Sequence, residues 1–577
     1  MSNDYAKYMK KPFSLSESDC EWIDRTLKGM TLEQKVAHLF CILIKDKPVE
    51  RMISEMRSLN FQPGSYMSDS FPAQKVKDNF CKLQAETEIP LLFACNLERG
   101  ADGICTEGTF YGTQMQTAAT ADSHYAYELG RVCAQEAAAC GANWNFGPVV
   151  DIDANFHNPI TNTRAFASDR DTVIEFSKAF IKGQIEEGLA VCIKHWPGDG
   201  QDERDQHMLT SINGLSAADW DASYGRIYKE LIDFGAQSVM AAHILQPSYS
   251  RLLNPSLKDN EIYPGSLSYE LTTGLLKERL GFNGLVVTDA TSMTGFMQVM
   301  SRHDALPVSI MAGCDIILFS LDIKEDFDIA LQAVKNGRIT MKRLDEAVST
   351  ILALKAHLRL HKKLAEQKTL EIDDVSSFFS DSPAKKKNVE SAKDCADKAV
   401  TLVKDVRHLL PLDVKKYKRV LLHVLGDKGG YHDPVKNTHK LFVSLMEKEG
   451  FEITLYDSEK LDLRPIGNSV SSFVERFDLI IYYCSVKTSG SDTVSRISWA
   501  PPGGCNTPRY FNDIPTLFIS VDNPYMLFDV PRVPSYINGY TPTPYVIEAI
   551  VEKIMGRSDF KGKSPVDPFC GLFDARF

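Results

Sequence analysis

The chain alternates short apolar runs with longer amphipathic segments, and this alternation recurs eight times over roughly its first 330 residues. The segments between the runs have the apolar spacing of helices. Strand and helix repeated eight times predict an α/β protein whose parallel strands close into a TIM-like (β/α)8 barrel. The runs, each short enough to be a strand, are 38–44, 61–66, 91–96, 143–151, 191–195, 238–243, 285–289 and 315–319.

Polar residues stand at the ends of five consecutive runs. In a parallel barrel the carboxyl ends of the strands form one rim, where barrel enzymes hold their active sites. We therefore expect these residues to converge there. The third to seventh runs lead, in order, to Asn96 and Glu98, to Asp151 and Asp153, to Lys194 and His195, to His243, and to Asp289.

Beyond residue 362 the pattern changes. The stretch 363–387 is polar and contains a Lys-Lys-Lys run, which predicts a linker between a barrel domain at 1–362 and a second domain at 388–577. The second domain resumes the alternation and is expected to be a smaller open α/β sheet. Its glycine-rich stretch 426–430 lacks the spacing of a dinucleotide fingerprint. We expect helices at 389–403, 436–448 and 544–555, and strands at 419–425, 452–456, 479–484 and 516–521.

The net charge and the cysteines indicate which partners and which cellular compartment to expect. A formal charge of −11 argues against nucleic acid or an anionic membrane, because either requires a basic face. We find no apolar run of the roughly 18 residues that span a bilayer, and no apolar core of a signal peptide near the first residues. The thirteen cysteines are scattered and include no Cys-x-x-Cys. We therefore expect reduced thiols in a cytoplasmic protein without a cofactor.

Asp289 ends the seventh run, in the string Thr-Asp-Ala-Thr-Ser-Met. One interpretation is that its carboxylate caps a helix that begins near Thr291, because aspartate is favoured at that position. The other is that it serves as a nucleophile in the mouth of the barrel. The polar ends of the neighbouring runs favour the nucleophile.

Asp205 and His207 lie in the polar loop that follows the fifth run. An imidazole is a natural acid and base near neutral pH, and a carboxylate two residues away can fix its tautomer. An isolated Asp-x-His is more often part of a solvated loop. A metal site that also includes Asp202 and Glu203 lacks the usual histidine spacing, so we favour the acid/base pair.

The remaining rim residues fit a sugar pocket. A sugar has several hydroxyl groups, and a pocket that binds them needs both hydrogen-bond donors and acceptors. The cationic residues among them could instead form structural ion pairs with Asp151, Asp153 or Glu98. We predict substrate contacts for Asn96, Glu98, Arg164, Lys194, His195 and His243.

Four strings of this chain resemble glycoside hydrolase family 3, and the resemblance extends over both domains. They are Asn-Phe-Gly-Pro-Val-Val-Asp-Ile-Asp at 145–153, Asn-Thr-Arg-Ala-Phe at 162–166, Lys-His-Trp-Pro-Gly-Asp-Gly at 194–200, and Val-Thr-Asp at 287–289 with Ser-Met at 292–293. The Lys-His-aromatic-Pro-Gly string followed by Asp-x-His is similar to the β-N-acetylglucosaminidase branch of the family.

The resemblance implies a retaining exo-glycosidase, a β-N-acetylhexosaminidase, with Asp289 as nucleophile, His207 as acid/base and Asp205 as its partner. It implies that Lys194, His195 and Arg164 hold sugar hydroxyls. The chain departs from the branch at Asn96-Leu-Glu98-Arg-Gly and at Gly198-Asp199-Gly200; the second string is similar to the β-glucosidase branch. Glucosidases of the family place an acid/base glutamate in a loop of the second domain, and the corresponding loop 488–496 has no glutamate.

Several alternatives stay open at this point. A neutral histidine repels an anion less than a carboxylate does, so phosphate could replace water as the acceptor and make the enzyme a phosphorylase. A β-glucosidase of the same family is a second alternative. An inactive sugar-binding protein would need to have lost the nucleophile or the acid, and a metal-dependent hydrolase would be inhibited by chelators.

Overall fold

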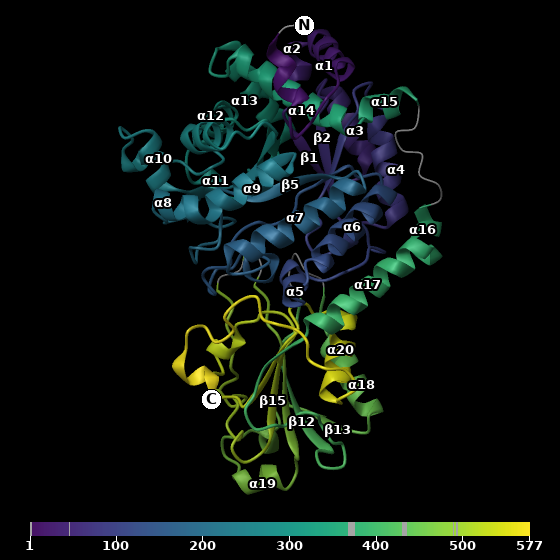
Figure 1. The fold of residues 1–577 in the computed structure, drawn as a ribbon, viewed down its shortest axis with the longest axis vertical. Coiled ribbons are helices and arrows are strands. Elements are labelled where there is room, and N and C mark those ends of the chain that lie inside the picture. The colour runs from purple at the N-terminus through teal and green to yellow at the C-terminus, as the bar shows by residue number, and fades with distance from the viewer. Residues whose placement is uncertain (1–2, 46, 367–374, 430–434, 489, 492–493) are drawn as a thin grey trace. The chain divides into compact units, whose positions relative to one another are not determined.

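The computed structural model describes the whole chain except residues 1–2, 46, 367–374, 430–434, 489 and 492–493 (Figure 1). The chain divides into two compact units. The first comprises Met1–Phe110, Ala126–Ile152 and Arg170–Asn388, and the second comprises Tyr111–Tyr125, Asp153–Asp169 and Val389–Phe577. The second unit thus takes in two segments from the predicted barrel region, and each unit is described by itself below.

The first unit contains a closed parallel barrel, as the eight apolar runs predict. Its eight strands pair in the order β1-β2-β3-β4-β5-β7-β9-β10, and a parallel bridge between Phe40 and Ile317 joins the last strand to the first. The strands are β1 (Cys41–Ile44), β2 (Ser65–Ser68), β3 (Leu92–Cys95), β4 (Trp144–Asn145), β5 (Ala190–Trp196), β7 (Ser238–Ala241), β9 (Leu285–Ala290) and β10 (Ile316–Leu318).

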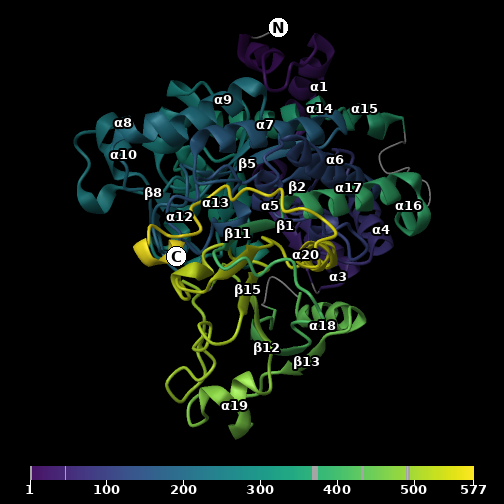
Figure 2. The ribbon, with the colours of Figure 1, turned by 60° about the horizontal axis from the view of Figure 1, so that its bottom comes forward.

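Helices surround these strands, and Figure 2 shows β1, β2 and β5 enclosed by them. A single α-helix connects β1 to β2, β2 to β3 and β4 to β5, whereas the other crossovers contain at least two helical segments; β5 and β7, for example, are joined by α8 and α9, and β7 and β9 by α10 and a helical segment at Glu270–Arg279. The helices of this unit are α1 (Glu17–Gly29), α2 (Leu32–Ala37), α3 (Val49–Ser58), α4 (Ala73–Gln84), α6 (His124–Ala139), α7 (Arg170–Glu186), α8 (Ala217–Trp220), α9 (Arg226–Phe234), α10 (Pro247–Leu253), α11 (Thr294–Met297), α12 (Arg302–Ala312), α13 (Ile323–Lys335), α14 (Met341–His357), α15 (Leu360–Ala365) and α16 (Val375–Asp381).

The fourth strand is much shorter than expected. We predicted a strand over 143–151, but the regular ladder covers only Trp144 and Asn145. The Gly147–Pro148 step interrupts it, because proline has no N–H to donate to a neighbouring strand. Irregular pairing with β5 continues past Asn145: Cys192 N donates to Gly147 O at 3.1 Å, Lys194 N donates to Pro148 O at 3.2 Å, and Val150 N donates to Lys194 O at 2.8 Å.

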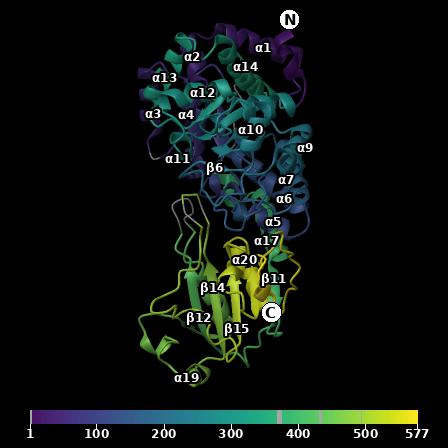
Figure 3. The ribbon, with the colours of Figure 1, turned by 90° about the vertical axis from the view of Figure 1, so that its left-hand side faces the viewer.

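The second unit is built on a six-stranded sheet of order β11-β16-β15-β14-β12-β13. Figure 3 shows β12, β14 and β15 side by side. Five strands run parallel and β11 is antiparallel. The elements are β11 (Thr401–Asp405), β12 (Arg419–Gly426), β13 (Glu452–Leu455), β14 (Leu479–Ser485), β15 (Thr516–Ser520) and β16 (Ser535–Asn538), with α5 (Gln114–Ala119), α17 (Pro383–Ala399), α18 (His439–Lys448), α19 (Val470–Val474) and α20 (Pro544–Ile554).

Both faces of this sheet are buried. Successive residues of β12 belong to different clusters: Val420 and Leu422 pack with α18 and α20 residues, whereas Leu421 packs on the other side. On that second face the rings of Tyr482 and Phe518 stack with centroids 5.7 Å apart. A parallel sheet is normally covered on both faces, because helical crossovers lie on each side of it.

Two expectations for the C-terminal half need revision. We expected a helix over 389–403, but α17 ends at Ala399 and residues 401–405 form β11. We also missed β16, the partner of β11. Short apolar runs such as Thr-Leu-Val do not distinguish helix from strand by periodicity, and here pairing with β16 decides. The segment 363–387, which we expected to be a linker, includes α16 and the start of α17 among its described residues.

Candidate active site

Lys194 stands near the end of β5 and is almost fully buried. Its ammonium group donates to Asn96 Oδ1 at 2.7 Å and lies 2.6 Å from Glu98 Oε1. Asn96 and Glu98 follow β3, so the structure brings together the ends of two strands as predicted from the rim. Lys194 therefore forms an ion pair with Glu98, as one of the two interpretations of this residue predicted. Its ammonium group also fixes the positions of the Asn96 and Glu98 side chains at the mouth of the barrel.

His195 is held by Asp151, a buried carboxylate at the end of the fourth run. The imidazole Nδ1 donates to Asp151 Oδ2 at 2.6 Å, and the backbone N–H of His195 donates to Asp151 Oδ1 at 3.1 Å. Because Nδ1 donates to Asp151, the tautomer of the imidazole is fixed. Asp151 thereby orients His195.

Asp205 and His207 form the predicted pair. His207 Nδ1 donates to Asp205 Oδ1 at 2.7 Å, and the backbone N–H of His207 donates to the same oxygen at 2.8 Å. The carboxylate side chain is 1% exposed, whereas the imidazole is 31% exposed. A buried carboxylate that fixes Nδ1 leaves Nε2 on the exposed ring to give or take a proton.

Asp289 lies at the end of β9 and does not cap a helix. The next helix, α11, begins at Thr294 and its N-cap is Met293. The carboxylate accepts from Ala290 N at 2.7 Å. Burial acts to raise the pKa of Asp289, but the nearby imidazoles of His195, His243 and His207 outweigh it and lower the pKa below its usual value. The loop that carries His207 also contacts the segment that follows β9, because Thr294 N donates to His207 O at 3.0 Å.

His243 follows β7 and has both ring nitrogens engaged. Nδ1 lies 2.9 Å from Ser266 Oγ, and Nε2 donates to Ala290 O at 3.0 Å. The residue is fully buried, and burial lowers the pKa of its imidazole. Through the hydrogen bond to Ala290 O, His243 supports the backbone next to Asp289. A contact of His243 with a sugar stays a prediction.

Arg164 belongs to the second unit, where its Nη1 donates to Ile160 O at 3.2 Å. The segment that carries it is fixed by Asp153, whose Oδ1 accepts from Thr161 Oγ1 at 2.5 Å and whose Oδ2 accepts from Tyr525 at 2.5 Å. Burial raises the pKa of Asp153 to about 6. The contact of Arg164 with a sugar stays a prediction. The loop 488–496 also belongs to the second unit and falls partly outside the described residues.

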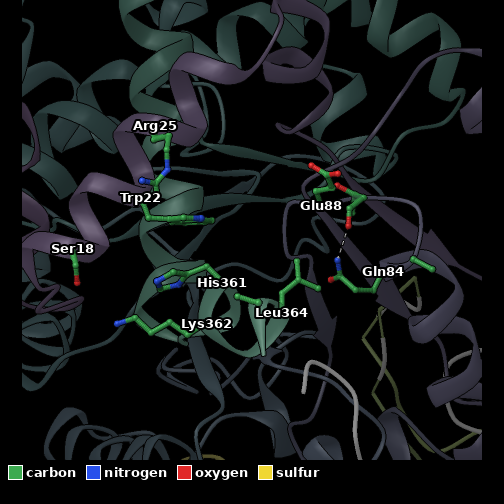
Figure 4. Close-up of a pocket in the computed structure, with 11 residues that line it drawn as sticks. Ser18, Trp22, Arg25, Gln84, Glu88, His361, Lys362 and Leu364 are labelled. Carbon is green, nitrogen blue, oxygen red and sulfur yellow. Dashed lines mark hydrogen bonds between the residues drawn. The ribbon is translucent and has the colours of Figure 1, made fainter. Parts of the chain in front are cut away.

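A pocket of about 700 Å³ lies elsewhere in the first unit, between α1, α15 and the turn that leads into β3 (Figure 4). The rings of Trp22 and His361 stack there with centroids 4.6 Å apart. The pocket is at the start of β3, whereas Asn96 follows the end of that strand, and none of the predicted site residues lines it. It is therefore not part of the candidate site.

Asp202, one of the residues considered for a metal site, is held by protein partners. Asp202 Oδ2 accepts from Ile212 N at 3.1 Å and pairs with Arg204 at 2.9 Å. Within the described part of the chain no group of three or more histidine, cysteine, aspartate or glutamate side chains is arranged to hold a metal ion. Nor does any helix in that part have the length and apolarity needed to cross a membrane.

Comparison with known proteins decides the family. The profile described as "Glycosyl hydrolase family 3 N terminal domain" matches residues 30–354, more than half of the chain. The chain belongs to glycoside hydrolase family 3. It is 39% identical over 568 residues to a Cellulomonas fimi protein named β-N-acetylglucosaminidase/β-glucosidase, which covers 98% of each chain.

Two solved structures are similar to this family 3 chain. One named β-glucoside phosphorylase BglX is 42% identical, with a TM-score of 0.92, and the match covers 99% of this chain and 100% of that chain. A family 3 β-N-acetylglucosaminidase from Paenibacillus sp. str. FPU-7 is 22% identical, with a TM-score of 0.77 over 94% of this chain and 100% of that one. The second likeness concerns the fold alone. As a member of family 3, the chain is a glycoside hydrolase.

Sequence reasoning about this family 3 site missed two residues and undervalued a third. We named Asp151 only as a possible ion-pair partner, although it orients His195. Asp199 and Gln206, which turn out to lie against each other, were not predicted to act at all. The departure from the family at Gly198-Asp199-Gly200 was the one signal in the sequence that pointed to this part of the loop.

Proposed function

We propose that this family 3 enzyme is a retaining exo-glycosidase that removes terminal β-linked N-acetylglucosamine, a β-N-acetylhexosaminidase. The observation that carries the proposal is the juxtaposition of a half-buried carboxylate, Asp289, with the His207–Asp205 pair on one barrel rim. The name of the 39% identical Cellulomonas fimi relative, which includes β-N-acetylglucosaminidase, supports the sugar.

In the first step a carboxylate oxygen of Asp289 attacks the anomeric carbon and the glycosidic C–O bond breaks. The electron pair of that bond goes to the leaving oxygen, which takes the proton from His207 Nε2. Asp205 accepts the Nδ1–H of the imidazole throughout, at 2.7 Å, and stabilises its charged form. The lowered pKa of Asp289 keeps the nucleophile ionised at neutral pH.

In the second step His207 Nε2 takes a proton from water. The water oxygen attacks the anomeric carbon, the bond to Asp289 breaks, and the carboxylate is restored with the sugar released as the β-anomer. Most retaining glycosidases use a second carboxylate in this role, so a histidine departs from the common scheme. Lys194, His195, Arg164, Asn96 and Glu98 would hold the sugar hydroxyls in both steps.

Substitution of the two reacting residues tests the scheme. Asp289→Ala should lower kcat by about 10⁴-fold or more on every substrate, because no covalent intermediate can form. His207→Ala should lower kcat/KM by about 10²–10⁴-fold on aryl glycosides with poor leaving groups, because these need protonation. The same variant should retain most of kcat/KM on 2,4-dinitrophenyl glycosides. Unchanged activity in Asp289→Ala would refute the scheme.

Phosphorolysis of a β-glucoside is the second candidate, favoured by one observation: the 42% identical structure bears the name β-glucoside phosphorylase. Release of 4-nitrophenol from matched β-N-acetylglucosaminide and β-glucoside substrates, with and without phosphate, separates the two. We expect preference for the N-acetyl sugar without a phosphate requirement. A rate that rises with phosphate and yields sugar 1-phosphate would establish phosphate as the acceptor, and a preference for the glucoside would reassign the sugar.

A further inference from the structure

Gln206 lies between the two members of the acid/base pair and is 1% exposed. Its Oε1 accepts from the backbone N–H of His243 at 3.0 Å, just beyond the end of β7. Its Nε2 lies 3.5 Å from Asp199 Oδ2, at the long end of the range for a hydrogen bond. The amide of Gln206 therefore lies between the segments that follow β5 and β7.

Asp199 is itself tied to the barrel. Its backbone N–H donates to Asp151 Oδ1 at 2.8 Å, so the carboxylate that orients His195 also places Asp199. Asp199 Oδ1 accepts from Gly200 N at 2.7 Å, which leaves Oδ2 on the side of Gln206.

The backbone around Gln206 is joined to the segment that follows the nucleophile. Thr294 N donates to His207 O at 3.0 Å, and Gly295 N donates to Gln206 O at 3.2 Å. Thr210 Oγ1 donates to Gly295 O at 3.0 Å. The loop that carries His207 is thus joined both to the strand end that presents Asp289 and, through Gln206, to the end of β7.

We propose that Gln206 is a positioning residue for the acid/base His207: its buried amide clamps the loop against the end of β7 and the Asp199 turn and so holds the imidazole over the reacting oxygen. This inference rests on the proposed role of His207. An acid must lie within about 2.6–3.2 Å of the atom that it protonates, and a displacement of about 1 Å can reduce the rate by about 100-fold.

Gln206→Leu, which keeps the size of the side chain and removes its polar atoms, is the first test. We expect kcat/KM on an aryl glycoside with a poor leaving group to fall by about 100-fold, and that on the 2,4-dinitrophenyl glycoside by less than about 5-fold. The steeper dependence on leaving-group pKa is the readout that a merely structural residue would not change. The fall of kcat/KM at high pH, which reports the loss of the proton from His207, should become less pronounced in the same variant.

Gln237→Leu is the matched control. Gln237 is 2% exposed, and its Oε1 accepts from the backbone N–H of Val191 at 3.1 Å, near the start of β5. It therefore makes the same kind of contact far from the acid/base loop. We expect it to change both substrates by the same small factor, with the leaving-group dependence of the wild type.

A reversed pair of substitutions covers the case in which Gln206→Leu fails to fold. Gln206→Glu retains an acceptor for His243 N but directs a carboxylate at Asp199, so activity on the poor leaving group should fall. Adding Asp199→Asn supplies a donor in the opposite direction, and we expect at least about 10-fold recovery, because the repulsion between two buried carboxylates is removed. Absence of recovery would overturn the role of the clamp.

His207→Ala, assayed alongside, separates the two hypotheses. If it shows no dependence on the leaving group, the acid/base assignment itself is wrong. If it behaves as proposed while Gln206→Leu retains the leaving-group dependence of the wild type, or matches Gln237→Leu, only the positioning role of Gln206 is overturned.

Discussion

The histidines of the barrel rim differ in the partners that hold their rings. His195 and His207 each donate Nδ1–H to a buried carboxylate, at 2.6 and 2.7 Å, and this fixes the tautomer of each ring. His243 has both nitrogens engaged. Identical side chains at neighbouring strand ends therefore have different capacities for chemistry, and the difference lies in their fixed partners.

A buried lysine offers a prediction about stability. Lys355 on α14 is fully buried and its Nζ lies 2.8 Å from His38 Nε2. Burial lowers its pKa well below the ordinary value, and the same cause lowers the pKa of His38. The folded state therefore favours neutral Lys355, whereas the unfolded chain protonates it below about pH 10.4. Stability from this group is present above that pH and is lost as the pH falls toward the depressed folded pKa.

Lys355→Met should consequently raise the unfolding temperature at pH 7, by about 1 °C for each kcal/mol gained. The gain in unfolding temperature should shrink as the pH approaches 10, because Lys355 is then less fully protonated in the unfolded wild-type chain. Calorimetry at pH 7 and pH 9.5 measures both effects. Lys553→Met is the control: Lys553 is also buried but pairs with Asp397 at 2.9 Å, so its removal should lower the unfolding temperature. A lower unfolding temperature in Lys355→Met would contradict the argument.

At the scale of elements, a single glycine at the start of α11 decides how closely the acid/base loop approaches the nucleophile strand. A Cβ added at Gly295 would lie 2.4 Å from Gln206 O and 3.1 Å from Leu209 O. Gly295→Ala should therefore push the loop outward and lower kcat/KM on a poor leaving group by about 10–100-fold, with less effect on the 2,4-dinitrophenyl glycoside. Gly214→Ala, where nothing lies within 4 Å of the added atom, is the control. Equal activity in the two variants would show that the loop tolerates the methyl group.

At the scale of the whole molecule, burial determines how readily the cysteine thiols react. All thirteen cysteines lie in the described part of the chain and are free, and all but Cys81 and Cys570 are buried. Burial raises the pKa of Cys81 and raises that of Cys570 to about 12, so Cys81 should react first. We expect mass spectrometry after mild thiol labelling to find at most two modified cysteines in the native protein and thirteen after denaturation. Four or more rapid modifications would contradict the packing described here.

The barrel was predictable because each of its strands is encoded by a short run of consecutive apolar residues. Each apolar run that we identified contains or overlaps a strand of the eight-stranded sheet. β11 and β16 were not predictable, because they pair across more than a hundred residues and neither carries a strong period of its own. The assignment of 111–125 and 153–169 to the second unit likewise depends on packing and not on local pattern.

By itself, therefore, the sequence determined the eight strands, the carboxylate and the Asp-x-His pair that it delivers to the rim, and the family. The strands and the site residues follow from periodicity and from residue types at short spacing. The family follows from the resemblance of four sequence strings to glycoside hydrolase family 3. Only the tertiary structure decided that Asp151 orients His195, that His243 has both nitrogens occupied, and that Gln206 lies against Asp199 and the end of β7. Such contacts join different strand ends, and they form only when closure of the barrel brings those ends together.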